Sequence, residues 1–159
     1  MIQRIQTLFL LGVVIISIIL FLLPISQKNI TNESSGISEI YTLNLDKVTL
    51  SSGNAIENTV TKTYGLLAVN AAILILSLAT IFMYRNRPLQ IKLCMLNSLL
   101  IAVLLVLIFY YSDGMGSKQI KPVYLPGIYL VAVQVLLLML SRRFIRKDDM
   151  LVKAADRIR

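Results

Sequence analysis

Four long stretches without a charged residue are the feature that most narrows how this chain can fold. They cover residues 5–23, 64–84, 93–111 and 123–141, so each is 19 to 21 residues long. A helix of this length reaches across the roughly 30 Å hydrocarbon core of a bilayer. Because a segment in lipid must satisfy its own backbone hydrogen bonds, helices are the expected form. The pattern predicts an all-α membrane protein, a four-transmembrane-helix bundle that makes one domain over residues 1–159.

The first stretch must be distinguished from a secretory signal peptide, because Arg4 precedes it. Its apolar run, Leu8 to Leu23, is longer than the roughly 7–15 residues of a signal peptide's hydrophobic region. No cleavage site with small residues follows at Pro24. We therefore expect the first helix to be retained.

Several kinds of chemical site are excluded by composition. The chain has no histidine, which removes Ser-His-Asp and Cys-His catalysis and His-ligated zinc, iron or copper. Its one cysteine, Cys94, cannot form an intrachain disulfide. An enzyme acting on lipid or quinone would need an acid or base at the membrane interface, where only Asp113, Asp148 and Asp149 are placed. We expect no enzyme, and no catalytic, cofactor-binding or metal site.

Positive charge gathers on one side of the predicted membrane. Both chain ends and the linker between the second and third stretches hold eleven of the sixteen Lys and Arg, but three of the eight Asp and Glu. That side therefore carries the whole net charge of +8. Because Lys and Arg accumulate in cytoplasmic loops, we expect both termini in the cytoplasm.

Residues 24–63 form the largest predicted extracytoplasmic loop. Within it Tyr41, Leu43 and Leu45 alternate with polar residues, which is typical of a half-buried strand. Asp46-Lys47 suits a turn, after which the alternation resumes. We predict a short β-hairpin near residues 39–51, which must lean on the helix ends or on a partner because an isolated hairpin is marginally stable.

Small and polar residues inside the predicted helices point to helix packing. The second stretch has one face with Asn70, Ser77 and Thr80, together with Tyr84, and another with small side chains. Small residues let helices approach closely, and amides can hydrogen-bond between them. The candidate packing residues are Gly65, Ala68, Asn70, Ala72, Ser77, Asn97, Ser98 and Gln134. A second interpretation is a polar path or ligand pocket built from Asn70, Asn97 and Gln134.

The tail, residues 142–159, alternates apolar and basic residues at helical spacing. Phe144, Leu151, Ala155 and Ile158 share one face, which predicts an amphipathic C-terminal helix. Such a helix either lies on anionic lipid of the cytoplasmic leaflet or docks onto a protein partner. Nucleic acid is disfavoured, because no aromatic residue interleaves the charges after Phe144. The candidate contacts with lipid or a partner are Arg4, Arg85, Arg87, Lys92, Arg142, Arg143, Arg146, Lys147, Asp149, Lys153, Arg157 and Arg159.

Three blocks of sequence resemble a known family. They are MIQRIQTL at residues 1–8, YRNRPLQIKLCMLN at 84–97 and DMLVKAADRIR at 149–159. The blocks are similar to those of small four-helix membrane proteins from Bacteroidota that are labelled only as a domain of unknown function. This resemblance implies a Gram-negative inner membrane and no known chemistry. It also directs attention to the cytoplasmic side, where all three blocks are expected.

Two functions from different classes remain open at this stage. The first is a non-enzymatic accessory or scaffold subunit of an envelope complex, which docks another membrane or envelope protein through its cytoplasmic face. The second is a small transporter or channel that forms a homo-oligomer, with a polar path through its helices.

Overall fold

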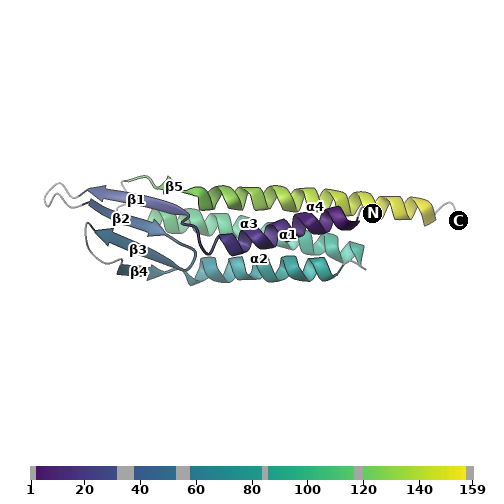
Figure 1. Cartoon of the computed structure of the whole chain (residues 1–159), viewed down its shortest axis with the longest axis horizontal. Helices are drawn as coiled ribbons and strands as arrows, with labels where there is room; N and C mark the ends of the chain where they lie inside the picture. The colour runs from purple at the N-terminus through teal and green to yellow at the C-terminus, as the bar shows by residue number, and fades with distance from the viewer. Residues whose placement is uncertain (1–2, 32–37, 53–57, 84–85, 117–119, 157–159) are drawn as a thin grey trace.

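A computed structural model of the chain describes residues 3–31, 38–52, 58–83, 86–116 and 120–156. For residues 3, 4, 31, 38, 87 and 152–156 it describes the backbone alone. The molecule is elongated, with helices running side by side over most of its length and an antiparallel sheet at one end (Figure 1). The described chain ends lie away from the sheet (Figure 1).

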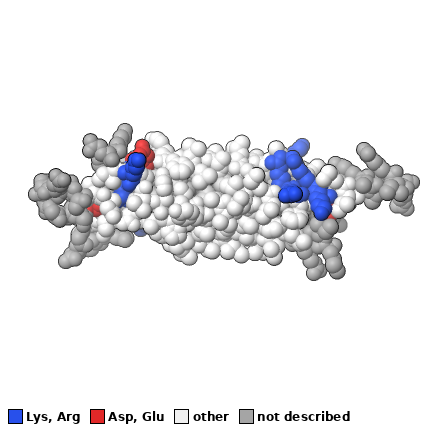
Figure 2. Space-filling model, turned by 90° about the horizontal axis from the view of Figure 1, so that it is seen from above, with Lys and Arg blue, Asp and Glu red and all other residues white. Residues whose placement is uncertain are grey.

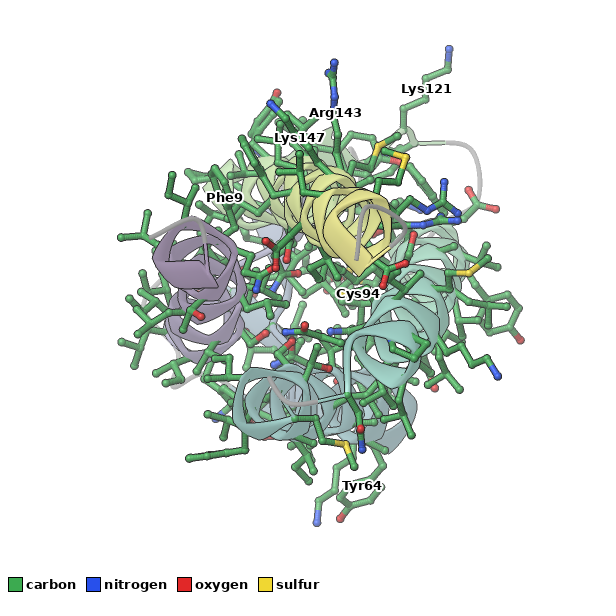
Figure 3. The ribbon with its side chains drawn as sticks, turned by 90° about the vertical axis from the view of Figure 1, so that its right-hand side faces the viewer. Phe9, Tyr64, Cys94, Lys121, Arg143 and Lys147 are labelled. Atoms are coloured by element: carbon green, nitrogen blue, oxygen red, sulfur yellow. The ribbon has the colours of Figure 1, made fainter. Side chains whose placement is uncertain are left out.

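The helices of the described chain are α1 (Gln3–Ile19), α2 (Tyr64–Phe82), α3 (Arg87–Gly114) and α4 (Pro126–Asp156). Helix α1 packs against α2 and α4, and α3 packs against the same two, so the helices ring a common interior (Figure 3). Helices α2, α3 and α4 are long and apolar enough to cross a membrane, which indicates a membrane protein. On the face that Figure 2 shows, no charged side chain of the described residues lies in the middle of the molecule.

The prediction of four spanning helices is wrong, because α1 falls short of the required length. Its apolar part covers Ile5–Ile19, and the chain then turns at residues 20–22. Pro24 prevents the helix from continuing through Leu23, since proline has no amide hydrogen and disfavours helical backbone at the residue before it. Within the residues that the structure describes, three helices rather than four have the length and apolarity needed to span a membrane.

The prediction of an all-α fold is also wrong. The described residues form a five-stranded antiparallel sheet in the order β4-β3-β2-β1-β5. Its strands are β1 (Ser26–Thr31), β2 (Ser38–Leu43), β3 (Lys47–Ser52), β4 (Asn58–Lys62) and β5 (Val123–Tyr124). Most of these strands are short and polar, and they are stabilised by pairing and by the helix ends beneath them rather than by their own composition.

The predicted hairpin is confirmed as the centre of this sheet. Strands β2 and β3 pair antiparallel with Leu43 opposite Val48, and the N–H of Asn44 donates to the carbonyl of Lys47 at 2.9 Å. Leu43, Leu45 and Val48 are buried where the sheet meets the helices. The alternation therefore located the turn to within about one residue.

The last two helices begin and end at other residues than predicted. Val123 and Tyr124 pair with β1 as strand β5, so the last helix begins at Pro126 instead of 123. Helix α3 begins at Arg87, which shortens the predicted linker. Helix α4 runs without interruption into the tail as far as Asp156, so the predicted amphipathic segment is its continuation.

Side-chain and backbone hydrogen bonds fasten the sheet to the helices. The hydroxyls of Ser26 on β1 and Ser112 on α3 lie 2.7 Å apart. At the start of α2, the Thr63 hydroxyl donates to the carbonyl of Leu45 at 3.0 Å. At the start of α4, the N–H of Gly127 donates to the carbonyl of Pro24 at 3.3 Å. Three of the four helices are thus anchored to the sheet or to the segment that enters it.

Candidate functional site: buried polar layers and the projecting end of α4

The interior of the helical part is built from residues spaced alternately three and four apart. Residues at this average spacing of about 3.5 lie along one side of a helix and face the neighbouring helices, as in coiled coils. Each of these buried side chains is at most 3% exposed. The series on α1 is Gln6, Leu10, Val13 and Ser17, continued by Leu20 just after the helix, and the series on α2 is Leu66, Asn70, Ile73, Ser77 and Thr80. The series on α3 is Gln90, Cys94, Asn97, Ile101, Leu104 and Ile108, and the series on α4 is Val131, Gln134, Leu138, Ser141 and Ile145. Oxygen and nitrogen atoms accordingly gather in the space that the helices enclose (Figure 3).

A polar layer nearer the sheet, called the upper layer here, joins three helices around Ser17. The Asn70 side chain on α2 donates from Nδ2 to the Ser17 carbonyl at 3.0 Å. The Gln134 side chain on α4 donates from Nε2 to the Ser17 hydroxyl oxygen at 2.8 Å. That hydroxyl donates in turn to the carbonyl of Val13 at 3.0 Å. The sequence-predicted residues Asn70 and Gln134 therefore meet at a residue of α1 that was not predicted.

A lower polar layer joins α2 and α3. Asn97 donates from Nδ2 to the hydroxyl oxygen of Ser77 at 2.7 Å, and this hydroxyl donates to the carbonyl of Ile73 at 2.8 Å. Nearer the end of the helices, Gln90 donates from Nε2 to the carbonyl of Thr80 at 3.3 Å. Ser77 and Ser141 each lie seven residues beyond the upper-layer residues of their own helices, which places Ser141 at the lower layer.

An apolar collar separates the two polar layers. One step along the buried series of α1, α2 and α4 leads from the upper layer to Val13, Ile73 and Leu138, and one step along α3 leads from Asn97 to Ile101. All four side chains are buried and carry no hydrogen-bonding group. The polar triplet Asn70, Asn97 and Gln134 is thus divided between two levels and does not form one continuous polar surface.

The remaining predicted packing residues lie further from the interior. Gly65, Ala72 and Ser98 are half-buried, and Ala68 is exposed. A Cβ at Gly65 would lie 3.6 Å from the Tyr111 hydroxyl, so this glycine is close to α3. The small-residue face of α2 is therefore only partly covered by the chain itself.

Sequence reasoning missed the buried polar residues Gln6, Ser17 and Gln90. A usable signal was present, because the three-and-four spacing of Asn97 extends back through Cys94 to Gln90. In the sequence, Gln90 falls within the predicted linker between the second and third apolar stretches. Gln6 and Ser17 belong to a corresponding series on α1, which includes Leu10 and Val13.

The far end of α4 projects beyond the other helices (Figure 1). Its root is held by Phe144, whose ring stacks on Phe9 of α1 with centroids 5.5 Å apart. A groove of about 800 Å³ runs along this part of the helix. It is lined by Met139, Leu140, Arg142, Arg143, Phe144, Arg146, Lys147 and Met150. An apolar floor beside four cationic groups suits an amphiphile with an anionic head.

The predicted contact residues fall into three groups at this end. Lys92, Arg143, Arg146 and Lys147 are exposed, whereas Arg142 and Asp149 are half-buried. Arg4, Arg87 and Lys153 lie on helices whose side chains at these positions are not described. Arg85, Arg157 and Arg159, like Tyr84, lie outside the described residues.

A second hollow, of about 390 Å³, lies at the other end, where the sheet meets α3. Tyr41, Tyr110 and Tyr111 contribute rings to it, and Gly116 lies beside them with a φ of +54°. The Tyr41 hydroxyl donates to Glu39 at 3.2 Å. Burial raises the pKa of Tyr41, and the neighbouring Glu39 carboxylate raises it further. The tyrosine ring belt is consistent with this end lying at a membrane interface.

Comparison with known proteins gives a family without an assigned chemistry. The family model described as "Domain of unknown function (DUF4293)" matches residues 2–158. The resemblance inferred from the three sequence blocks is thus confirmed as one to a family of unknown function. No curated protein matches the chain.

Proposed function

The chain belongs to the DUF4293 family, a domain of unknown function, and from this premise we propose that it is a non-enzymatic accessory or scaffold subunit of an envelope complex. In this proposal it resides in a bacterial inner membrane and docks a protein partner through the end of α4. The end of the molecule that bears both chain ends faces the cytoplasm, in keeping with the bias of Lys and Arg toward that side.

The projecting part of α4 is the observation that carries this proposal. The C-terminal end of α4 projects beyond the ends of α1, α2 and α3 (Figure 1). In the last turns of this helix Met150 is 64% exposed and Leu151 is 50% exposed. Large apolar side chains presented on an aqueous surface beside Arg and Asp are typical of protein interfaces. The apolar residues supply contact area, and the charges around them set the partner's orientation.

The root of the same helix supports a lipid contact that is compatible with docking. Arg143, Arg146 and Lys147 border the groove beside Phe144 and Met139. Near a membrane surface each such cation contributes about 1 kcal/mol of attraction to anionic lipid. Lipid would thus bind the cationic part of the groove, and the partner would bind Leu151 together with Met150, which lines the far edge of the groove.

The test is purification from native membranes in mild detergent, with an affinity tag in the outer loop near residue 35. We expect a stoichiometric protein companion, identified by mass spectrometry, that is lost when Met150 and Leu151 are both changed to Ser. A matched control is Val60→Ser, because Val60 is 51% exposed at the opposite end of the molecule. Recovery of the protein alone, or equal loss of the companion in the control, contradicts docking through α4.

A second candidate is transport by a homo-oligomer, which the buried amides favour. Asn70, Asn97 and Gln134 place polar atoms at two levels of an otherwise apolar interior. Passage would require the apolar collar between these levels to open. Replacing all three with Ala should then abolish solute flux into liposomes while the helical circular-dichroism signal persists. Loss of both together indicates that the amides serve helix packing alone.

A further inference from the structure

The orientation of each buried amide is determined by the groups that it contacts. Asn70 and Gln90 face backbone carbonyls, which only accept, so their nitrogen atoms must point there. Gln134 and Asn97 face the hydroxyls of Ser17 and Ser77. Both hydroxyls already donate their single hydrogen to a backbone carbonyl, so they too can only accept from the amide.

It follows that every one of these amides turns its carbonyl oxygen away from its hydrogen-bond partner. The four oxygens, Asn70 Oδ1, Asn97 Oδ1, Gln90 Oε1 and Gln134 Oε1, are buried and accept no hydrogen bond from any described group. The Ser141 hydroxyl is also buried at the lower layer, where the Cys94 side chain is a hydrogen-bond partner for it. Exchanging the oxygen and nitrogen of an amide would not satisfy these groups, because the hydrogen bond from the nitrogen to a carbonyl or hydroxyl oxygen would then be lost.

These oxygens call for a ligand that is small, neutral and a hydrogen donor. A buried acceptor without a partner loses the hydrogen bond that it would make to water. A cation is a poor candidate, since the described faces of these layers hold no carboxylate to balance its charge. Water donates two hydrogens and needs little room, and buried waters typically occupy such polar sites.

We propose that the two polar layers are separate internal water-binding sites. In the upper site, water donates to Asn70 Oδ1 and Gln134 Oε1, whose amide nitrogens both bind Ser17. In the lower site, water donates to Asn97 Oδ1, the oxygen that the Asn97–Ser77 hydrogen bond leaves without a partner among the described groups. The collar of Val13, Ile73, Ile101 and Leu138 keeps the two sites apart. The inference goes beyond both proposed functions, because it holds whether or not the protein docks a partner or passes a solute.

Water-edited solid-state NMR on the full-length protein in phosphatidylglycerol and phosphatidylcholine bilayers tests this directly. Polarisation transferred from water to the side-chain NH₂ groups of Asn70, Asn97 and Gln134 is compared with transfer to the backbone amides of Ile73, Ile101 and Leu138. The collar residues are the matched control, because they are buried at a neighbouring depth in the same helices. We expect the side-chain signals to build up several-fold faster than the collar signals.

Equal build-up in the wild-type protein overturns the proposal, and this comparison does not depend on any variant. Asn97→Leu then tests whether the sites are separate. This variant removes the lower acceptor, and transfer to Asn70 and Gln134 should remain within twofold of the wild-type value. Loss of transfer at both levels overturns the division into two sites.

Discussion

Lys28 and Asp113 are 85 residues apart in sequence, yet the Lys28 ammonium donates to the Asp113 backbone carbonyl at 2.8 Å. Lys28 lies on β1 and is fully buried, and Asp113 is in the last turn of α3. Carbonyls at a helix C-terminus lack helical partners and carry partial negative charge, so a cation is favourable there. This contact and the Ser26–Ser112 pair beside it join β1 of the sheet to the C-terminal end of α3.

Lys28→Met should lower the free energy of unfolding by about 1–3 kcal/mol, because the Asp113 carbonyl loses a charged donor at a part-buried contact. Thermal unfolding in detergent, followed by circular dichroism, measures the change. Lys121→Met is the control, since Lys121 is exposed and should alter stability little. Equal stability of both variants would show that the Lys28 contact contributes nothing.

Gly127→Ala should destabilise the protein by about 1–3 kcal/mol, the usual cost of overpacking a close contact. A Cβ at this position would lie 2.7 Å from the Pro24 carbonyl oxygen and 3.1 Å from the Ile25 Cα, both backbone atoms with little freedom to move. Gly114→Ala is a matched control, because a Cβ there meets no atom within 4 Å. Comparison of the two melting temperatures checks the prediction, which fails if the control is the more damaged variant.

Asn97→Ala should destabilise the helices by about 0.6–2 kcal/mol, the range of interhelical hydrogen bonds in membranes. The variant loses the 2.7 Å bond to Ser77 that links α3 to α2. Ser98→Ala, at the adjacent half-buried position, should change stability by less. Unfolding in a detergent titration measures the stability of both variants. An equal loss of stability in the two would contradict a packing role for Asn97.

Neutralising Arg143, Arg146 and Lys147 to Gln should reduce the anionic lipid that remains bound to the purified protein. At about 1 kcal/mol per cation, the three changes together should weaken retention on the order of 100-fold. Native mass spectrometry after reconstitution in mixed phosphatidylglycerol and phosphatidylcholine gives the measurement. Changing Lys47 and Lys121 to Gln, at the sheet end, should leave retention unchanged; unaltered binding in the triple variant would argue against a lipid site at α4.

How far the sequence predicted the fold depends on where the apolar residues fall. Helices α2, α3 and α4 were predictable because an uncharged apolar run of spanning length has few other stable forms. The central hairpin was predictable from the alternation around Leu43. Strand β1, with sequence SQKNIT, and strand β4, with NTVTK, carry no such pattern. They exist because backbone groups pair with a neighbouring strand, and pairing is a property of the assembled sheet.

The candidate sites show the same division. Asn70, Asn97 and Gln134 stood out because an amide in an apolar run is costly unless it is paired. Their partners could not be read from periodicity, since Ser17 joins helices that are 53 and 117 residues away in sequence. The early end of α1 was missed for a local reason, because the apolar run continues to Leu23 although the helix stops at Ile19.

The unbroken course of α4 also has a mechanical consequence. This helix has 31 residues and begins at Pro126, one residue beyond β5, and its second residue, Gly127, lies against the backbone of Pro24. At about 1.5 Å per residue it is a rod of roughly 46 Å, so a tilt of about 10° at one end displaces the other by about 8 Å. A tilt of α4 at the sheet end would therefore displace the exposed side chains of Met150 and Leu151 at its other end. The two ends of the molecule are joined by a stiff strut rather than by a hinge.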